Sequence, residues 1–369
     1  MKPKLLIFEL RMIGDAIMSL PFVRAAAASF EVWVCCAPGC VAVFETVLPK
    51  ERIIGWQPPW LVESGKYAWR RWRTSGIGDL VRRVRSVGAD VAVSVWADAR
   101  THGLMALSGA RERVGFPMVA VNHYANHLAW RRRQLLGGGV LNVVAGVALG
   151  RRLLTRKLLR ADYRQHHVEN WRQLAEALGL AWDARAPWFA AGTAGVSAEV
   201  SGLVAQARTA GRPVWVVHPG GRVPEQRWPL AGFERVIREV LLPAGVLVLA
   251  VKPPEVDFGA EWEGLAPVVR PGNLGELFGV VNLADVVMCN DTGVAHVAAG
   301  LGKKVIGIFT ASEPDWFAPW GSREYVVRQA VCAFHPCLGR CVMPTVICRD
   351  AVTVELVAAR VRQVLAEQT

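Results

Sequence analysis

Residues 286–301 read VVMCNDTGVAHVAAGL: an apolar run, a turn of small and polar residues, then an apolar stretch at helical spacing. This order predicts a buried strand, a tight turn and a helix, the repeating step of a doubly wound α/β sheet. Parallel strands covered by helices on both faces have such near-continuous apolar runs. The other predicted strands are 4–10, 31–36, 90–96 and 113–116 in the first half, and 213–218, 245–251 and 304–309 in the second. The sequence therefore predicts two parallel α/β sheets.

The series of strands breaks once along the chain. An amphipathic helix is predicted over 165–180, and an Ala-, Pro- and Gly-rich stretch follows over 181–195. A chain of 369 residues can build two separate cores. We expect one Rossmann-like domain over 1–190, a second over 191–350, and a closing helix over 351–369.

The net charge of +12 is unevenly placed. Residues 1–160 carry 24 Lys and Arg against 10 Asp and Glu, whereas the remainder carries 19 against 21. A basic first domain favours an anionic partner, such as an acidic glycolipid, although a basic surface can also be incidental. We find no nucleic-acid-binding motif and no apolar run long enough to span a bilayer. We therefore expect a cytoplasmic protein that touches the cytoplasmic face of the inner membrane and binds no nucleic acid.

The first predicted strand contains Glu9 near its end, and the turn after it contains Arg11, Gly14 and Asp15 before an apolar helix begins. A carboxylate in the first turn of a helix can act as a general base, or it can simply cap the helix. The segment is not a dinucleotide fingerprint because G-x-G-x-x-G is absent. Both roles of Asp15 stay open at this point.

Two polar turns follow strands of the second half. One contains His218, Gly220 and Gly221 and leads to Arg227; glycine allows close backbone approach and arginine can bind phosphate oxygens. The other, residues 290–296, opens a helix, whose free N–H groups and positive dipole end suit a diphosphate. Each could instead be an ordinary turn, with the helix capped by Asp or Thr and His296 part of the core.

Taken in order, these three segments resemble glycosyltransferase family 9, which includes the ADP-heptose:lipopolysaccharide heptosyltransferases. The resemblance rests on Arg11-x-x-Gly14-Asp15, on His218-Pro219-Gly220 with Arg227-Trp228-Pro229, and on Asn290-Asp291-Thr292-Gly293-x-x-His296. It implies a GT-B fold, in which two Rossmann-like domains face a central cleft. It also implies inverting transfer of heptose from ADP-heptose to a lipopolysaccharide core-type acceptor.

The resemblance assigns roles to individual residues. Asp15 would be the general base, with Arg11 and Gly14 on the acceptor side, and no cofactor would be needed for catalysis. The residues implied at the donor site are His218, Gly220, Gly221, Glu255, Asp291, Thr292, Gly293 and His296. Such enzymes usually carry a lysine where this chain has Gln226, so Arg227 would supply the cation instead. Asp257 is a second candidate for the acidic residue that binds ribose.

Four cysteines lie close together near the end of the second domain, namely Cys332, Cys337, Cys341 and Cys348. Four thiols can bind structural zinc or iron tetrahedrally, with His335 as a substitute ligand. Their spacing contains no C-x2-C pair, so reduced structural cysteines are the alternative.

Four tryptophans in an Arg-rich stretch of the first domain, Trp56, Trp60, Trp69 and Trp72, could dock on a membrane, stack on sugars, or pack a loop against the core. Two further functions also remain open: a GT-B enzyme that uses another nucleotide sugar and a protein, metabolite or capsule acceptor, and a non-catalytic nucleotide-sugar-binding homologue.

Overall fold

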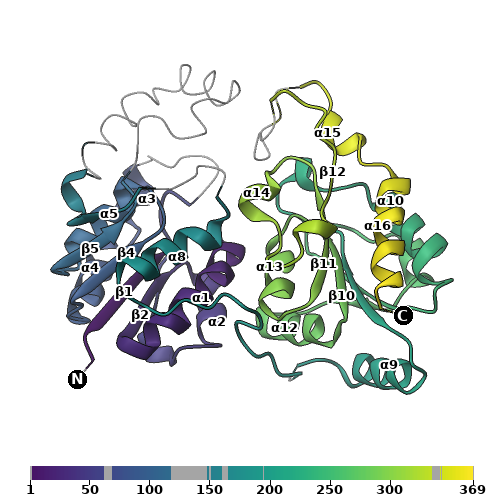
Figure 1. Cartoon of the computed structure of the whole chain (residues 1–369), viewed down its shortest axis with the longest axis horizontal. Helices are drawn as coiled ribbons and strands as arrows, with labels where there is room; N and C mark the ends of the chain where they lie inside the picture. The colour runs from purple at the N-terminus through teal and green to yellow at the C-terminus, as the bar shows by residue number, and fades with distance from the viewer. Residues whose placement is uncertain are drawn as a thin grey trace. The chain divides into compact units, whose positions relative to one another are not determined.

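A computed structural model describes residues 2–61, 69–117, 148, 151–159, 165–193, 195–334, 341 and 343–368 of the chain (Figure 1). The chain divides into two compact units, Met1–Trp188 and Phe189–Thr369. Each unit contains its own parallel sheet and helices. No helix in these ranges has the length and apolar character needed to cross a membrane.

Unit 1 contains a parallel sheet of six strands in the order β3-β2-β1-β4-β5-β6. The strands are β1 (Lys4–Glu9), β2 (Glu31–Cys36), β3 (Ile53–Gly55), β4 (Val91–Ser94), β5 (Glu112–Gly115) and β6 (Arg156–Lys157). The helices are α1 (Ile13–Ser29), α2 (Val41–Phe44), α3 (Trp69–Arg73), α4 (Ile77–Ser86), α5 (Ala99–Leu107) and α8 (His167–Ala177).

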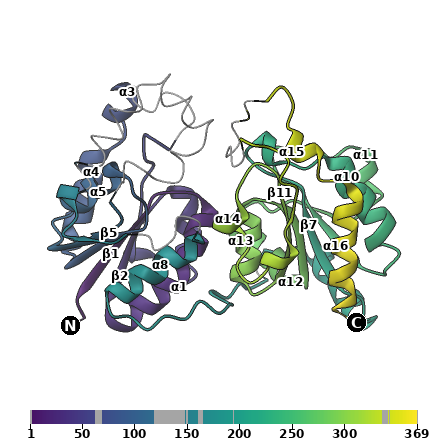
Figure 2. The same cartoon turned by 45° about the horizontal axis from the view of Figure 1, so that its top comes forward.

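The two faces of this sheet bury different residues of β1. Leu6 and Phe8 belong to the core built with α4 and α5. Because side chains alternate along a strand, Ile7 and Glu9 point to the opposite face. Helices α1 and α8 lie side by side (Figure 2). Right-handed crossovers place α1 and the α4–α5 pair on opposite faces of the sheet.

Unit 2 repeats this topology with the order β12-β11-β10-β7-β8-β9. Its strands are β7 (Val214–His218), β8 (Leu247–Val251), β9 (Val268–Val269), β10 (Val286–Asn290), β11 (Lys304–Phe309) and β12 (Val327–Arg328). Its helices are α9 (Ala198–Thr209), α10 (Leu230–Val236), α11 (Ala260–Glu263), α12 (Leu274–Leu283), α13 (Gly293–Gly300), α14 (Pro314–Phe317), α15 (Ile347–Asp350) and α16 (Val354–Ala366). The last of these, α16, packs on α10 over one face of the sheet.

The strand order fixes where a ligand can bind. In both units the first and fourth strands of the chain order are neighbours, β1 with β4 and β7 with β10. The connections leave these two strands in opposite directions, so a crevice opens at their carboxyl ends. The polar turns predicted as sites follow β1, β7 and β10, and they therefore lie at these switch points.

The predicted α/β fold with parallel sheets is confirmed. The predicted strands are all present, with ends that differ by at most two residues. Four strands were not predicted, namely β3, β6, β9 and β12, and each has only two or three residues. Two residues of the predicted metal site, His335 and Cys337, lie outside the described residues.

Candidate active site

Asp15 lies in the first turn of α1, directly after β1. Its Oδ2 accepts a hydrogen bond from the main-chain N–H of Met12 at 3.1 Å, so the carboxylate does cap the helix. The other oxygen, Oδ1, accepts no hydrogen bond from the described part of the chain. Capping uses one oxygen and leaves the second available to a substrate hydroxyl, so the two roles predicted for Asp15 are compatible.

The surroundings of Asp15 suit a base that works near neutral pH. Burial raises the pKa of Asp15 to about 6, while the Met12 N–H and the Arg11 guanidinium lower this pKa. A general base is most effective when its pKa lies close to the working pH. The predicted catalytic role of Asp15 stays a prediction, because geometry alone does not test it.

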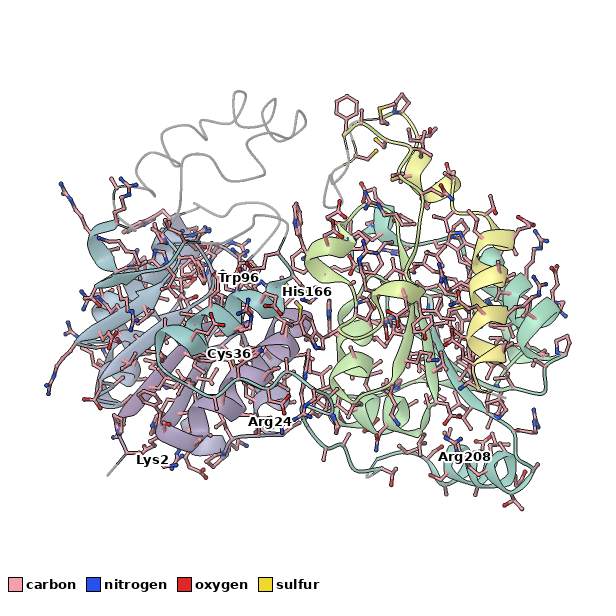
Figure 3. All side chains as sticks on the ribbon, viewed as in Figure 1. Lys2, Arg24, Cys36, Trp96, His166 and Arg208 are labelled. Atoms are coloured by element: carbon pink, nitrogen blue, oxygen red, sulfur yellow. The ribbon has the colours of Figure 1, made fainter. Side chains whose placement is uncertain are left out.

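A second carboxyl group, Glu9, lies fully buried at the end of β1. Its two oxygens each lie 3.0 Å from the indole Nε1 of Trp96, which donates to both. Trp96 stacks on the ring of His167, the first residue of α8, with centroids 4.5 Å apart. Figure 3 labels Trp96 and His166, the residue before His167 in the chain. Sequence reasoning missed this pair, because Trp96 is 87 residues from Glu9 along the chain.

Arg11 was predicted to lie on the acceptor side of the site. Its guanidinium lies over the ring of Trp96, 4.4 Å from the centroid, and 3.9 Å from the carboxylate of Asp98. Asp98 is also bound by Arg100, whose guanidinium contacts both carboxylate oxygens. Gly14 is buried in the first turn of α1. Unit 1 thus presents two half-exposed arginines at the switch point of its sheet.

In unit 2, the turn after β7 is held by internal contacts. A Cβ on Gly220 would lie only 2.6 Å from the ring of His218 and 2.7 Å from Pro253. The glycine therefore makes room for neighbouring side chains, whereas the sequence had suggested close approach of a ligand. Burial lowers the pKa of His218 to about 4, which leaves its imidazole neutral.

Asn290 ties the two turns of unit 2 together, a function that the sequence did not reveal. It is the fully buried last residue of β10. Its Nδ2 donates to the carbonyls of Pro219 and Gly220 at 2.8 and 3.0 Å, and its Oδ1 accepts from the N–H of Trp228 at 3.1 Å. Every polar atom of this buried amide side chain is therefore used to position backbone.

Two neutral side chains donate hydrogen bonds to Asp291. The Nε2 of Gln226 donates to its Oδ2 at 3.3 Å, and the Ser312 hydroxyl donates to the same oxygen. The glutamine at this position therefore binds a carboxylate directly. This contact explains how an amide is accommodated where a lysine was expected.

Thr292 is the N-cap residue of α13, yet its side chain does not cap the helix. Its Oγ1 is buried and makes no hydrogen bond within the described residues. A buried hydroxyl without a partner is costly in a folded protein, and a bound ligand can supply the missing partner. Gly293 and Val294 begin the helix, so their N–H groups have no partner in the preceding turn. His296 is buried in the same helix.

Arg227 lies beside the β7 turn. Its Nε donates to the carbonyl of Gly221 at 2.6 Å, and its Nη1 lies 3.4 Å from the carbonyl of Glu255. The Glu255 carboxylate accepts from the N–H of Gly221 at 2.7 Å. Asp257, by contrast, pairs with Lys252 on the surface. Arg227 and Glu255 thus both contact Gly221 in the turn after β7, and Glu255 and Asp257 both stay candidates for the residue that binds ribose.

The predicted metal site cannot be assembled from the described residues. They contain no group of three or more His, Cys, Asp and Glu that could hold a metal ion, and Cys337 lies outside them. Cys348 is buried, whereas Cys332 and Cys341 are half-buried. The metal tetrad and the reduced cysteines therefore both stay predictions.

Comparison with known proteins agrees with this geometry. The model of "Glycosyltransferase family 9 (heptosyltransferase)" matches residues 142–344. The glycosyl transferase family 9 protein from Veillonella parvula is 16% identical, with a TM-score of 0.68 and coverage of 99% of this chain and 98% of that chain. Escherichia coli ADP-heptose lps heptosyltransferase II is 16% identical, with a TM-score of 0.64 and 99% coverage of both chains. The E. coli heptosyltransferase WaaC with ADP is also 16% identical, with a TM-score of 0.63, 99% of this chain and 100% of that chain. No curated protein sequence gives a significant match.

Two doubly wound units with polar turns at their switch points have the fold of these solved structures, and the family model assigns the class, a glycosyltransferase. The family match covers more than half of the chain. The protein belongs to glycosyltransferase family 9, the heptosyltransferase family.

Proposed function

We propose that this enzyme transfers heptose from ADP-heptose to a hydroxyl group of a lipopolysaccharide core-type acceptor, with inversion at the transferred carbon. Unit 2 binds the donor and unit 1 binds the acceptor. Asp15 removes the proton of the acceptor hydroxyl as the sugar–phosphate bond breaks. The proposal requires no cofactor and places the enzyme in the cytoplasm.

The observation that carries the donor assignment is the buried hydroxyl of Thr292 at the start of α13, which has no hydrogen-bond partner among the described residues. A helix N-terminus offers main-chain N–H groups and a positive dipole end to an anion. Arg227, fixed by the carbonyls of Gly221 and Glu255, adds a permanent cation nearby. The E. coli WaaC structures with ADP and with ADP-2-deoxy-2-fluoro heptose support a nucleoside diphosphate as the ligand of this site.

This arrangement meets the electrostatic demands of glycosyl transfer. Positive charge develops on the sugar and negative charge on the departing diphosphate, so fixed donors on the diphosphate side stabilise the transition state. The acceptor oxygen needs a base on the other side of the sugar. Asp15 has a pKa near 6 and a second oxygen that accepts no hydrogen bond from the described residues, as that role requires.

Calorimetric titration and a transfer assay test the proposal separately. Titration with ADP, UDP and GDP should show preferential binding of ADP, and Thr292→Val should weaken it. Incubation with ADP-heptose and a heptose-deficient lipopolysaccharide core should release ADP and extend the acceptor. Binding of ADP without transfer to any core acceptor would refute the proposed acceptor and leave the assignment of the donor site unaffected.

One feature favours a different donor sugar. Gln226, rather than a lysine, contacts Asp291, so this part of the site carries one positive charge fewer than the family resemblance implies. An uncharged glutamine in place of a lysine would change which sugar hydroxyl groups the site can bind. A panel of ADP-, GDP- and UDP-sugars would identify such a donor by its higher kcat/KM.

We also propose that unit 1 touches an anionic membrane through α3. Trp56, Trp60 and Trp72 pack on one another, with ring centroids 5.4 and 5.5 Å apart, which favours the packing role that the sequence left open for them. Trp69 is different, because it is 74% exposed beside the exposed Arg70, Arg71 and Arg73. Tryptophan and arginine together suit a lipid headgroup region. Sedimentation with phosphatidylglycerol vesicles should be weakened by Trp69→Ala and by high salt, and phosphatidylcholine vesicles should bind poorly.

A further inference from the structure

The proposed reaction does not use Glu9, the last residue of β1 in unit 1. Its carboxyl group is fully buried, which alone would make an ionised form costly. Burial raises the pKa of Glu9 well above its ordinary value, and the nearby charge of Asp15 raises it further. The Trp96 hydrogen bond and Arg11 act in the opposite direction. Burying such a carboxyl group costs folding free energy, and a contribution to function would explain why it is there.

The contacts of Glu9 lead directly to Trp96. The indole has a single N–H donor, and that donor lies 3.0 Å from each Glu9 oxygen. The ring also stacks on His167 at an interplanar angle of 28°. An indole held at its N–H and across one ring face cannot turn without losing one of these contacts. Glu9 therefore fixes the plane of Trp96.

The plane of Trp96 in turn locates a cation. The guanidinium of Arg11 lies 4.4 Å from the centroid of the Trp96 ring, within the range of a cation–π interaction. The side chain of Arg11 is 36% exposed. Apart from the Trp96 ring, its guanidinium lies near the carboxylate of Asp98, at 3.9 Å. Without the indole surface, a long and half-exposed arginine would be free to sample other rotamers.

Arg11 is also the cation that acts on Asp15. The guanidinium lowers the pKa of Asp15, against the burial that raises it to about 6. Displacing Arg11 would therefore move the pKa of Asp15 upward and reduce the ionised fraction at a given pH. The contacts thus run from Glu9 through Trp96 and Arg11 to the proposed base.

We propose that Glu9 is a positioning residue: its buried carboxyl group fixes the indole of Trp96, which holds the guanidinium of Arg11 in place at the turn that also carries Asp15. Glu9 does not touch the substrate. The inference rests on the proposed role of Asp15 as the base, and it adds that the Glu9–Trp96 pair sets the pH at which that base becomes available.

Other titratable groups surround this pair. Cys36 at the end of β2 and Cys40 beside it interact electrostatically with Glu9, but burial raises the pKa of both thiols, so they stay protonated. His167 faces Trp96 from α8, and Asp98 faces Arg11 from the start of α5. Burial alone would raise the pKa of Asp98, but binding to Arg100 keeps it below its ordinary value, so Asp98 stays ionised. The cysteine thiols and Asp98 therefore keep one charge state near pH 6.

The pH profile of kcat/KM provides the first test, through its acid limb, the pH range in which activity falls as Asp15 becomes protonated. Trp96→Phe and Arg11→Met should each shift this limb upward by roughly half a pH unit, the effect of losing one partly screened charge. The double variant should shift no further than Arg11→Met, because both changes remove the same cation. Trp56→Phe is the matched control: it removes an indole N–H that donates to Ser75 at 2.7 Å and should leave the limb in place. An unshifted limb in Trp96→Phe would overturn the inference.

Variants of Glu9 separate positioning from a purely structural role. Glu9→Gln keeps an oxygen acceptor for the indole, so the acid limb should stay in place. Glu9→Ala should shift it as Trp96→Phe does, and Glu9→Asp provides a milder change if the alanine variant does not fold. A loss of thermal stability in all three variants, without any shift of the limb, would show that Glu9 serves stability alone.

A readout that needs no substrate keeps this inference distinct from the proposed function. In the full chain labelled with ¹⁵N-tryptophan, the Trp96 indole resonance is identified by its absence in Trp96→Phe. Its hydrogen exchange should be slow in the wild type and in Glu9→Gln, and at least tenfold faster in Glu9→Asp or Glu9→Ala. Equal protection in all of them would overturn the positioning role, even if the enzyme proved to use a different donor or acceptor.

Discussion

The two units share one strand order and differ in the residues that end the strands and form the turns after them. At the switch point of unit 1, β1 and the turn after it supply two carboxyl groups, Glu9 and Asp15. Arg11 lowers the pKa of both, and the Trp96 hydrogen bond lowers that of Glu9. At that of unit 2, β7 and β10 lead into glycines, a buried amide in Asn290 and the hydroxyl of Thr292. The same scaffold therefore offers proton chemistry in one unit and anion binding in the other.

This difference shows how little of the function depends on the sheet itself. Topology determines that a ligand site forms beyond β1 and β4, or beyond β7 and β10. The residues in the turns after these strands determine its chemistry. The contrast can be tested by removing the acid–base chemistry from one unit and the anion contacts from the other.

Removing the carboxylate of unit 1 should have the largest effect. Asp15→Asn keeps an oxygen for the Met12 N–H but cannot accept a proton at neutral pH. We expect kcat to fall by about 10³-fold, within the range for loss of a general base. Affinity for ADP, measured by calorimetry, should be unchanged because the donor site is in unit 2. Turnover close to that of the wild type would remove Asp15 from the mechanism.

The pH profile should sharpen the same point. Because the pKa of Asp15 is about 6, kcat/KM should fall nearly tenfold per pH unit below that value and level off above it. Stability should change in the opposite direction. The folded pKa lies above the ordinary value of 3.8, so the folded protein retains a proton that the unfolded chain loses. Ionisation of Asp15 therefore lowers the free energy of unfolding as pH rises from about 4 to about 6. Asp15→Asn should flatten thermal denaturation midpoints over this window.

In unit 2, Thr292→Val should weaken donor binding roughly tenfold, the order expected for one hydrogen bond to a charged group. The fold should tolerate the change, since Oγ1 has no partner in the described chain. Thr310→Val is the matched control, because the Thr310 hydroxyl donates to the Glu225 carbonyl at 2.7 Å. The control should lose thermal stability and keep most of its affinity for ADP. The reverse pattern would contradict the assignment of Thr292 to the donor.

The sequence predicted the long central strands because their apolar runs are continuous, as in Val286–Asn290 and Lys304–Phe309. It did not predict β6 or β12, in which Arg156 and Arg328 lie. Two-residue strands at the edge of a sheet are too short for any periodicity. They form because a neighbouring strand offers unpaired main-chain groups, and single-sequence reasoning does not include that neighbour.

The same limit applied at the candidate site. The sequence was enough to select Asp15, Arg227 and Thr292 as candidate site residues, because each lies in the segment that follows a predicted strand. Asn290 and Glu9 were seen only as neighbours of those residues, since their partners Trp228 and Trp96 are 62 and 87 positions away. Gly220 has a further reason that the sequence did not show, because its lack of a side chain accommodates His218 and Pro253. Spacing along the chain identifies turns, whereas contacts across the sheet explain why each residue is there.

The smallest effect should come from chelation of metal ions. In the proposed mechanism the departing diphosphate is stabilised by the N-terminus of α13, Thr292 and Arg227, so no divalent cation is needed there. EDTA should therefore leave kcat/KM within about twofold of its untreated value, a change too small to reflect loss of a catalytic metal. Elemental analysis of the same sample, with Cys341→Ser as its comparison, would distinguish a structural zinc or iron at the cysteines from reduced thiols. A large loss of activity that Mg²⁺ restores would mean that unit 2 depends on a cation beyond Arg227.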